Sequence, residues 1–277
     1  MTFSWAKGHG TENDFVLLPD ADGRVHGDLD PAFVAALCDR RRGLGADGVL
    51  RVVRTSAVGE AGDGQGEAEW FMDYRNADGS VSEMCGNGVR VFARYVADHE
   101  LVDTDRPLPI GTRDGIKTVT FDGDAISVDM GVPELGGVSK VTVEGRTFEA
   151  DEVHTGNPHA VAQVASLDDA GTLLEEPGYD RAVYPHGVNI ELVARRGPQH
   201  VAMRVHERGS GETRSCGTGA CAAAVASMSA DGVALPATYR VDVPGGRLDV
   251  TWTPEGRVVL TGPAEIVAEG EMEWLRG

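Results

Sequence analysis

Apolar and polar residues alternate along most of this chain, which is the pattern of half-buried β-strands. Runs rich in β-branched and aromatic residues predict strands within 3–18, on either side of a polar turn at 8–14, and at 48–54, 68–73, 117–121, 125–130, 138–143, 153–164, 188–193, 201–205, 237–243, 247–253 and 258–261. Helical spacing occurs at 31–40, 89–101 and 220–228. The last of these is apolar on every side, which predicts a fully buried helix. Residues 55–67 are rich in Gly and Glu and predict an exposed loop, and a final segment covers 265–275.

Two glycine-flanked cysteine motifs divide the chain into similar halves. Met84-Cys85-Gly86-Asn87-Gly88 and Ser215-Cys216-Gly217-Thr218-Gly219 each precede a predicted helix, and they lie about half the chain length apart. Asn76 and Glu207 stand at the same distance before the two cysteines. The matching halves indicate one old duplication rather than an array of short repeats.

The length of 277 residues allows two domains that each bury a core. The sequence predicts an α+β fold with two pseudo-symmetric domains, each a mixed or antiparallel, barrel-like sheet wrapped around a central helix. We expect an N-terminal domain at 1–125, to which a segment at about 264–277 returns, and a C-terminal domain at 126–263. Both central helices would then begin at the cleft between the domains.

The composition is that of an ordinary globular protein, with 41% hydrophobic and 25% charged residues. The net charge of −19 argues against binding to nucleic acid or to an anionic membrane surface. No apolar run reaches the roughly 18 residues of a membrane-spanning helix, and the first residues lack the pattern of a signal peptide. We therefore expect a cytoplasmic protein.

Four cysteines, at positions 38, 85, 216 and 221, do not make a disulfide framework in a chain of this length. None lies in CxxC or zinc-site spacing, so no metal is expected. Cys38 lies in an apolar helical stretch and Cys221 among alanines, so both are interpreted as packing residues.

Cys85 and Cys216 each stand at the start of a predicted helix, where unpaired N–H groups and the helix dipole stabilise negative charge. Such a position can lower the pKa of a cysteine from about 8.5 into the range of about 3.5–7.5. The same N–H groups can bind a carboxylate and stabilise the charge that develops as an adjacent carbon loses its proton. Two thiols facing each other across a cleft could invert one carbon without a cofactor. The alternative interpretation is two small buried cysteines.

Further candidates for a substrate site stand beside turn or glycine signals: Asn13, Asn76, Asn157, Asn189, His159, Glu207 and Arg208. Asparagine donates and accepts, so it suits the ammonium and carboxylate of an amino acid, although it also favours turns for its own reasons. Glu207 and Arg208 could hold the same two groups, or form a solvated charge pair. His159 could act near a thiol or be structural.

These motifs resemble those of the diaminopimelate epimerase family. The similar segments are Gly8–Phe15, Asn76–Ser80, Met84–Arg90, Gly156–His159 and Glu207–Cys221, in order along the whole chain. The resemblance implies an isomerase that needs neither pyridoxal phosphate nor another cofactor. It would interconvert LL- and meso-2,6-diaminopimelate for lysine and peptidoglycan synthesis. The resemblance also implies a homodimer, and it implies no binding partner other than this small-molecule substrate.

The resemblance also implies roles for individual residues. Cys85 and Cys216 are the acid–base pair, with Cys85 facing the LL isomer. The carboxylate at the reacting centre is held by backbone N–H groups of Gly86, Asn87, Gly217 and Thr218. The rest of the substrate is bound by Asn13, Asn76, Asn157, Asn189, Glu207 and Arg208. The pKa values of the thiols are adjusted by His159 and Glu207.

Two positions depart from the family pattern. Gly48 stands where some members carry a substrate-contacting glutamine, and a glycine can offer only its backbone there. Ala268 stands where some members have a tyrosine at the dimer contact, so the expected homodimer could use a different interface.

Three other interpretations share part of the evidence. A proline or hydroxyproline racemase also pairs two cysteines, but it typically carries His in place of Asn87 and lacks the Glu207-Arg208 feature. A non-catalytic relative would have exchanged its cysteines, and both are present here. A redox sensor that uses the two thiols as a switch stays open.

Overall fold

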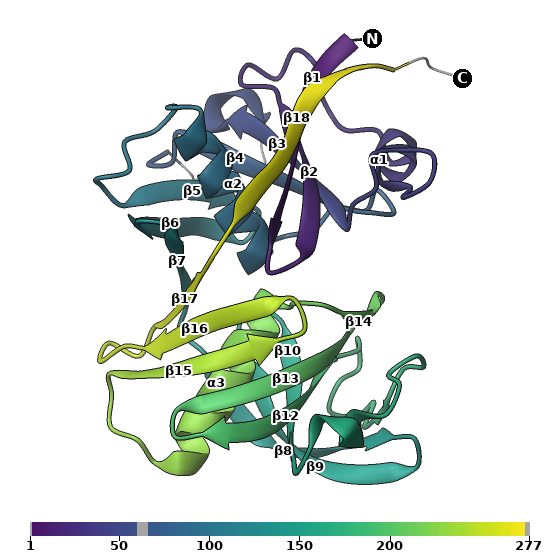
Figure 1. The fold of residues 1–277 in the computed structure, drawn as a ribbon, viewed down its shortest axis with the longest axis vertical. Helices are drawn as coiled ribbons and strands as arrows, with labels where there is room; N and C mark the ends of the chain where they lie inside the picture. The colour runs from purple at the N-terminus through teal and green to yellow at the C-terminus, as the bar shows by residue number, and fades with distance from the viewer. Residues whose placement is uncertain (1, 60–65, 275–277) are drawn as a thin grey trace. The chain divides into compact units, whose positions relative to one another are not determined.

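The structure is a computed structural model that describes residues 2–59 and 66–274. It divides into two compact units (Figure 1). Unit 1 comprises Met1–Val128 and Pro263–Gly277, and unit 2 comprises Asp129–Gly262. Each unit is a sheet that curves around one long helix.

The strands of unit 1 are β1 Thr2–Gly10, β2 Asn13–Pro19, β3 Gly48–Arg54, β4 Trp70–Asn76, β5 Leu108–Thr112, β6 Gly115–Asp122, the first part of β7 Ala125–Gly131, and β18 Glu265–Glu273. They are neighbours in the order β18-β1-β2-β3-β4-β5-β6-β7. The pairs β2–β3 and β4–β5 are parallel, and the other neighbours are antiparallel. The helices are α1 Pro31–Cys38 and α2 Gly86–Asp98, with a 3-10 turn, η1, at Thr55–Ala57.

The strands of unit 2 are β8 Glu134–Val143, β9 Arg146–His154, β10 Pro158–Val164, β11 Gly178–Tyr179, β12 Asn189–Gly197, β13 His200–Glu207, β14 Gly211–Thr213, β15 Ala237–Val243, β16 Gly246–Trp252 and β17 Val258–Gly262. The main order is β8-β9-β10-β12-β13-β15-β16-β17, in which β10–β12 and β13–β15 are parallel and the rest antiparallel. The short strands β11 and β14 pair with β8 and β13. The helix is α3 Gly217–Asp231, and a 3-10 turn, η3, lies at Leu167–Ala170.

The two units repeat one pairing scheme. From β18 to β7 in unit 1, and from β8 to β17 in unit 2, the sequence of parallel and antiparallel pairs is the same. In each unit the long helix precedes the strand that forms the second parallel pair. The predicted α+β fold with two pseudo-symmetric halves around central helices is therefore confirmed.

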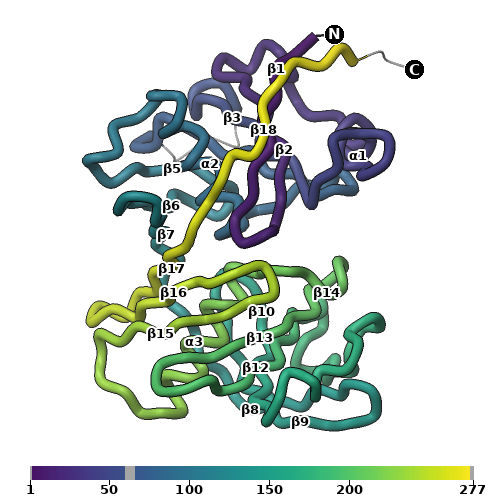
Figure 2. The backbone as a smooth tube through the Cα atoms, viewed as in Figure 1, coloured from purple at the N-terminus to yellow at the C-terminus, as the bar shows by residue number. Residues whose placement is uncertain are grey.

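The last strand of the chain belongs to the unit that contains the first. β18 pairs antiparallel with β1, from Thr2 opposite Glu273 to His9 opposite Glu265, so the two ends of the described chain lie side by side (Figure 2). Within the described residues, β18 has no strand on its other edge. It is therefore an edge strand.

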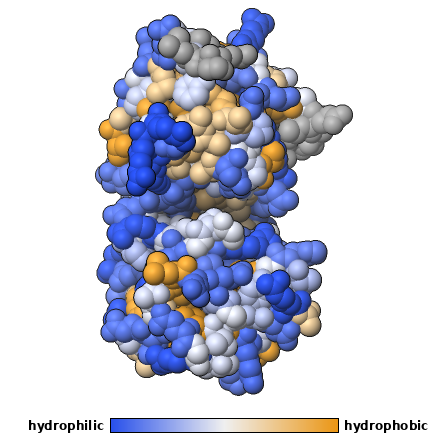
Figure 3. Space-filling model, turned by 90° about the vertical axis from the view of Figure 1, so that its right-hand side faces the viewer, coloured by the Kyte–Doolittle hydropathy of each residue, from blue (hydrophilic) through white to orange (hydrophobic). Residues whose placement is uncertain are grey.

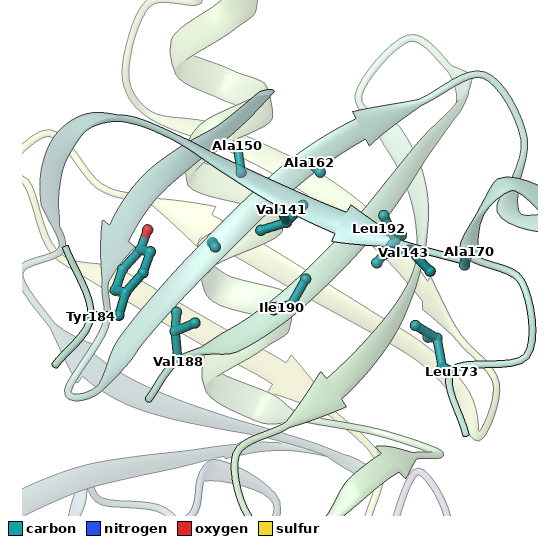
Figure 4. Close-up of a cluster of buried hydrophobic side chains, with 11 residues drawn as sticks. Val141, Val143, Ala150, Ala162, Ala170, Leu173, Tyr184, Val188, Ile190 and Leu192 are labelled. Atoms are coloured by element: carbon teal, nitrogen blue, oxygen red, sulfur yellow. The ribbon is translucent and has the colours of Figure 1, made fainter. Parts of the chain in front are cut away.

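The central helix of unit 2 is covered on all sides. Every residue of α3 from Gly217 to Met228 is buried, as its apolar pattern predicts, and the helix contacts strands of its own unit. The other face of β12 carries a second cluster, in which Ile190 and Leu192 pack with Val141 of β8 (Figure 4). Because both faces of β12 are covered from Asn189 to Ala194, a charged side chain in this part of the strand has to find its partner inside the protein.

The first turn of the chain is shorter than the sequence pattern predicts. Gly10 pairs with Asn13, so only Thr11 and Glu12 form the hairpin turn, with φ angles of 51° and 64°. Positive φ at both central residues matches the twist of a two-residue hairpin. Because positive φ is uncommon for Thr and Glu, the sequence did not predict this short turn. The turn places Asn13 at the first position of β2.

Some elements escaped the sequence pattern. β5 contains a proline and a glycine, β9 is mostly polar or charged, and β14 has three residues, so none shows a clear apolar alternation. Of the loop expected at 55–67, residues 60–65 lie outside the described residues, and Thr55–Ala57 form η1.

The face of the molecule in Figure 3 is mostly hydrophilic, with hydrophobic areas between the polar side chains. This surface agrees with the net charge of −19. No helix within 2–59 and 66–274 is long and apolar enough to span a membrane.

His26 in unit 1 is a partly buried titratable group whose ring nitrogens are both buried. Its ring lies 5.0 Å from that of Phe3 and 5.9 Å from that of Phe33, between centroids. Both ring nitrogens are buried without a hydrogen-bond partner among the described residues. Burial lowers the pKa of His26 below its usual 6.5, with a smaller lowering from Arg51 and an opposing effect of Asp20.

We expect the free energy of unfolding to decrease as the pH falls through about 6.5, because the unfolded chain then binds a proton that folded His26 resists. Urea unfolding between pH about 8 and about 5 measures this slope. His26→Leu should flatten the slope, whereas replacement of exposed His186 by Leu should leave it unchanged. Equal slopes for wild type and His26→Leu would contradict the assignment.

Candidate active site

The two cysteines of the repeated motifs cap the two central helices. Cys85 is the N-cap residue of α2, and Cys216 is the N-cap residue of α3. Both have extended backbone, with φ of −144° and −121°. Each thiol therefore lies where the first N–H groups of a helix point outward without partners in the helix. Cys85 is partly exposed and Cys216 is buried.

In unit 1, the side chain of Asn13 lies next to Cys85 and is itself bound by Asn87. The Asn13 Oδ1 lies 3.6 Å from the Cys85 Sγ and accepts a hydrogen bond from the Asn87 Nδ2 at 3.2 Å. The Asn13 Nδ2 donates to the Asp47 Oδ2 at 2.8 Å. An ionised carboxylate has no hydrogen-bond donor, so the amide nitrogen of Asn13 has to face Asp47, and this fixes the orientation of the amide. The oxygen of Asn13 is thereby directed to the thiol.

A buried arginine supports the first turn of α2. Arg90 is fully buried, and its guanidinium donates to the Asn87 Oδ1 at 2.9 Å and to the Gly86 carbonyl at 3.3 Å. It also donates to the Pro263 carbonyl at 3.4 Å, next to β18. These contacts hold the backbone of the first motif in one conformation.

Asn76 and Gly48 lie opposite each other at the ends of β4 and β3. Asn76 donates from Nδ2 to the Ser80 Oγ at 2.9 Å. A Cβ on Gly48 would lie 2.6 Å from the Arg75 carbonyl oxygen and 2.7 Å from the Tyr74 ring. The packing of this backbone therefore excludes a side chain at position 48.

In unit 2, Cys216 has a different environment. Its Sγ accepts a hydrogen bond from the Gly219 N–H at 3.3 Å and lies 3.4 Å from the Thr218 Oγ1. Burial raises the pKa of Cys216 well above its ordinary value, and the charges of Glu207 and Glu191 raise it further. The lowered pKa expected from the helix start is therefore wrong for Cys216, because burial and two carboxylates outweigh the helix N–H groups.

Glu207 ends β13 beside this thiol. Burial raises the pKa of the Glu207 carboxyl, and hydrogen bonds from Thr213 and Cys216 act in the opposite direction. The Thr213 hydroxyl donates to the Glu207 Oε1. Thiol and carboxyl thus affect each other: the hydrogen bond from Cys216 lowers the pKa of Glu207, and the charge of Glu207 raises the pKa of Cys216.

The remaining candidates of unit 2 lie on the neighbouring strand ends. His159 of β10 is fully buried, and its Nε2 lies 2.8 Å from the Asn157 Oδ1. Asn189 of β12 is opposite His159 in register, and its Oδ1 accepts from the Arg208 N–H at 2.9 Å. The Arg208 guanidinium donates to the His186 carbonyl at 3.0 Å.

Sequence reasoning missed three buried or bridging charges: Asp47, Arg90 and Glu191. Glu191 and Arg90 interrupt apolar patterns, in a strand and a helix, and that interruption is the signal that could have found them. Asp47 stands in a Gly-Ala-Asp-Gly turn, where aspartate is common for local reasons, so it gave no such signal.

The geometry defines a duplicated α+β protein with one thiol at the start of the central helix in each half. Residues 5–136 and 152–267 match the family model described as diaminopimelate epimerase. The chain belongs to the diaminopimelate epimerase family, which confirms the resemblance seen in its motifs.

Relatives with this description cover nearly the whole chain. The chain is 58% identical to the diaminopimelate epimerase of Streptomyces coelicolor, over 99% of this chain and 97% of the relative. It is 49% identical to that of Rhodococcus opacus, over 99% of both. A solved Bacillus anthracis phenazine biosynthesis protein of the PhzF family shares the fold, with a TM-score of 0.73 at 16% identity over 99% of this chain and 100% of that one.

The second glycines of the two motifs, Gly88 and Gly219, differ in the space that a Cβ would have. A Cβ on Gly219 would lie 2.6 Å from the Glu191 Oε1 and 3.3 Å from the Cys216 Sγ. At the equivalent Gly88, the nearest atom is the Leu50 Cδ2 at 3.4 Å, an ordinary contact.

We expect Gly219→Ala to lower the free energy of unfolding by about 1–3 kcal/mol, because the added methyl group must displace a buried carboxylate. The matched variant Gly88→Ala should be neutral or stabilising by up to about 1 kcal/mol, since alanine favours a helix. Urea unfolding of both variants measures the difference. Equal stabilities would show that the carboxylate of Glu191 does not lie against α3.

Proposed function

We propose that this chain interconverts LL- and meso-2,6-diaminopimelate by two-thiol proton transfer at Cα, in the synthesis of lysine and peptidoglycan precursors. The observation that carries the proposal is the repeated N-cap cysteine, one for the central helix of each unit, in a member of the diaminopimelate epimerase family. In this proposal the two units are the functional halves of the enzyme, and each supplies one thiol to the substrate.

The proton transfer uses the different states of the two thiols. In the LL-to-meso direction, Cys85 as thiolate takes the Cα proton of the LL isomer, and Cys216 as thiol gives its proton to the opposite face. Cys85 ends as thiol and Cys216 as thiolate, so the reverse reaction starts from the product state. The raised pKa of Cys216 supports its resting form as the proton donor. His159 and Glu207 adjust the proton affinity of the thiols.

The helix starts stabilise the charge formed on the way. When Cα loses its proton, negative charge spreads onto the neighbouring carboxylate. The N–H groups that bind this carboxylate are those of Gly86, Asn87, Gly217 and Thr218, in the first turns of α2 and α3. No cofactor is needed in this scheme, because helix N–H groups replace the electron sink that a cofactor provides.

The distal amino-acid end of the substrate needs its own contacts. We assign it to side chains that can both donate and accept, or that carry opposite charges: Asn13, Asn76, Asn157, Asn189, Glu207 and Arg208. Glu207 and Arg208 are adjacent in the chain, so one segment can meet both the ammonium and the carboxylate. A proline-type substrate lacks this second end, which disfavours a racemase of cyclic amino acids.

The deciding experiment is proton exchange followed by NMR in heavy water with LL-diaminopimelate. Wild type should incorporate deuterium at Cα and form the meso isomer. Cys85→Ala and Cys216→Ala should each lose epimerisation by about 10⁴-fold or more, because one proton-transfer group is missing. Cys38→Ala and Cys221→Ala are the matched controls and should retain exchange.

Two outcomes would redirect the assignment. Exchange of proline but not of diaminopimelate would indicate a racemase of cyclic amino acids. Absence of exchange with both, together with reversible oxidation of Cys85 and Cys216, would favour the redox sensor.

We also propose that the enzyme is a homodimer in the cytoplasm, where its four free cysteines stay reduced. The exposed edge strand β18 carries Ala268 at the position of the family's dimer contact. Sedimentation velocity at micromolar concentration should give the mass of two chains of 29.3 kDa. A single species of one chain would overturn the dimer.

A further inference from the structure

Glu191 is a charged residue in an otherwise apolar stretch of β12 and has no part in the scheme above. Its side chain is fully buried. It projects to the face of the strand opposite Ile190 and Leu192, where the first turn of α3 packs. A buried carboxylate is costly unless a positive group or hydrogen-bond donors compensate it, so its partners define its role.

Glu191 binds the imidazole of His159. The Glu191 Oε1 lies 2.7 Å from the His159 Nδ1, and both side chains are fully buried. The other oxygen, Oε2, has no hydrogen-bond partner among the described residues. His159 is therefore the one group in the described part of the chain that is placed to compensate this carboxylate directly.

The second ring nitrogen of His159 also faces an acceptor. Its Nε2 lies 2.8 Å from the Asn157 Oδ1. A carboxylate oxygen and an amide oxygen both accept hydrogen bonds, so a ring between them satisfies both contacts only when both nitrogens carry protons. Such a ring is a cation and forms a neutral, buried pair with Glu191.

The pair is adjacent to the second thiol. The Glu191 Oε1 would meet a Cβ on Gly219, whose N–H binds the Cys216 Sγ. The titratable groups that face the pair from neighbouring elements are Glu207, Cys216 and Tyr184.

We infer that Glu191 is a positioning residue that holds His159 as the doubly protonated imidazolium and thereby fixes the Asn157 amide. The inference rests on the proposed function, in which His159 and Asn157 serve the substrate site. The Nε2–H of His159 locks the Asn157 oxygen and leaves its amide nitrogen for the substrate. Without the charge on Glu191, the ring loses a proton and Asn157 loses its fixed orientation.

The test is ¹⁵N NMR of the histidine ring nitrogens near neutral pH in substrate-free protein, with His159→Gln to assign the signals. In wild type, both nitrogens of His159 should appear protonated. In Glu191→Gln, which keeps the size and an acceptor but removes the charge, one nitrogen should appear unprotonated. The control Glu149→Gln, at an exposed position of β9, should leave the His159 signals unchanged. With diaminopimelate, Glu191→Gln should lower kcat/KM by about 10²-fold.

A singly protonated His159 in wild type, or a doubly protonated one in Glu191→Gln, would overturn the inference. If Glu191→Gln does not fold, the wild-type spectrum alone still shows whether both ring nitrogens of His159 are protonated. Because the spectrum requires no turnover, its result is independent of the proposed function. A doubly protonated ring that depends on Glu191 in a protein inactive on diaminopimelate would keep the inference and remove only the function.

Discussion

A helix that is buried on all sides has to begin inside the protein, where water cannot satisfy its first N–H groups. Much of this structure follows from that constraint. In unit 2 the Cys216 Sγ takes the N–H of Gly219 at the start of α3. At this turn a Cβ on Gly219 would meet the Glu191 carboxylate, which explains the second glycine of the motif in unit 2. In the proposed function, a substrate carboxylate is the anion that binds the first-turn N–H groups.

Buried charges are arranged around the two helix starts in different ways. In unit 1, Arg90 binds the first motif itself, and Asp47 orients Asn13 toward Cys85. In unit 2, burial raises the pKa of Cys216, and the carboxylates of Glu207 and Glu191 raise it further. Two halves with the same strand pairing thus give their thiols unlike surroundings. This asymmetry suits a reaction in which one thiol must be ionised while the other is protonated.

The sequence contained the architecture and most of the candidate site, because apolar alternation and the cysteine motifs are local signals. Contacts that join distant segments were not accessible in this way. The hydrogen bond that Asn13 donates to Asp47, and the pair of Glu191 with His159, depend on which strands become neighbours. The prediction of a lowered pKa for Cys216 was wrong for the same reason, because this pKa depends on burial and on carboxylates from β12 and β13. The two-residue turn at Thr11 and Glu12 was missed because its residues contradict the usual preference for glycine.

The pairing of β18 with β1 has a consequence for the order of synthesis. Unit 2 is one continuous segment, whereas unit 1 is assembled from both ends of the chain. On the ribosome, all of unit 2 emerges before the strand that covers β1 and the carbonyl of Pro263 that Arg90 binds. The half of the protein that is made first is therefore completed last, and until then the nascent chain exposes an open sheet edge next to the first cysteine motif.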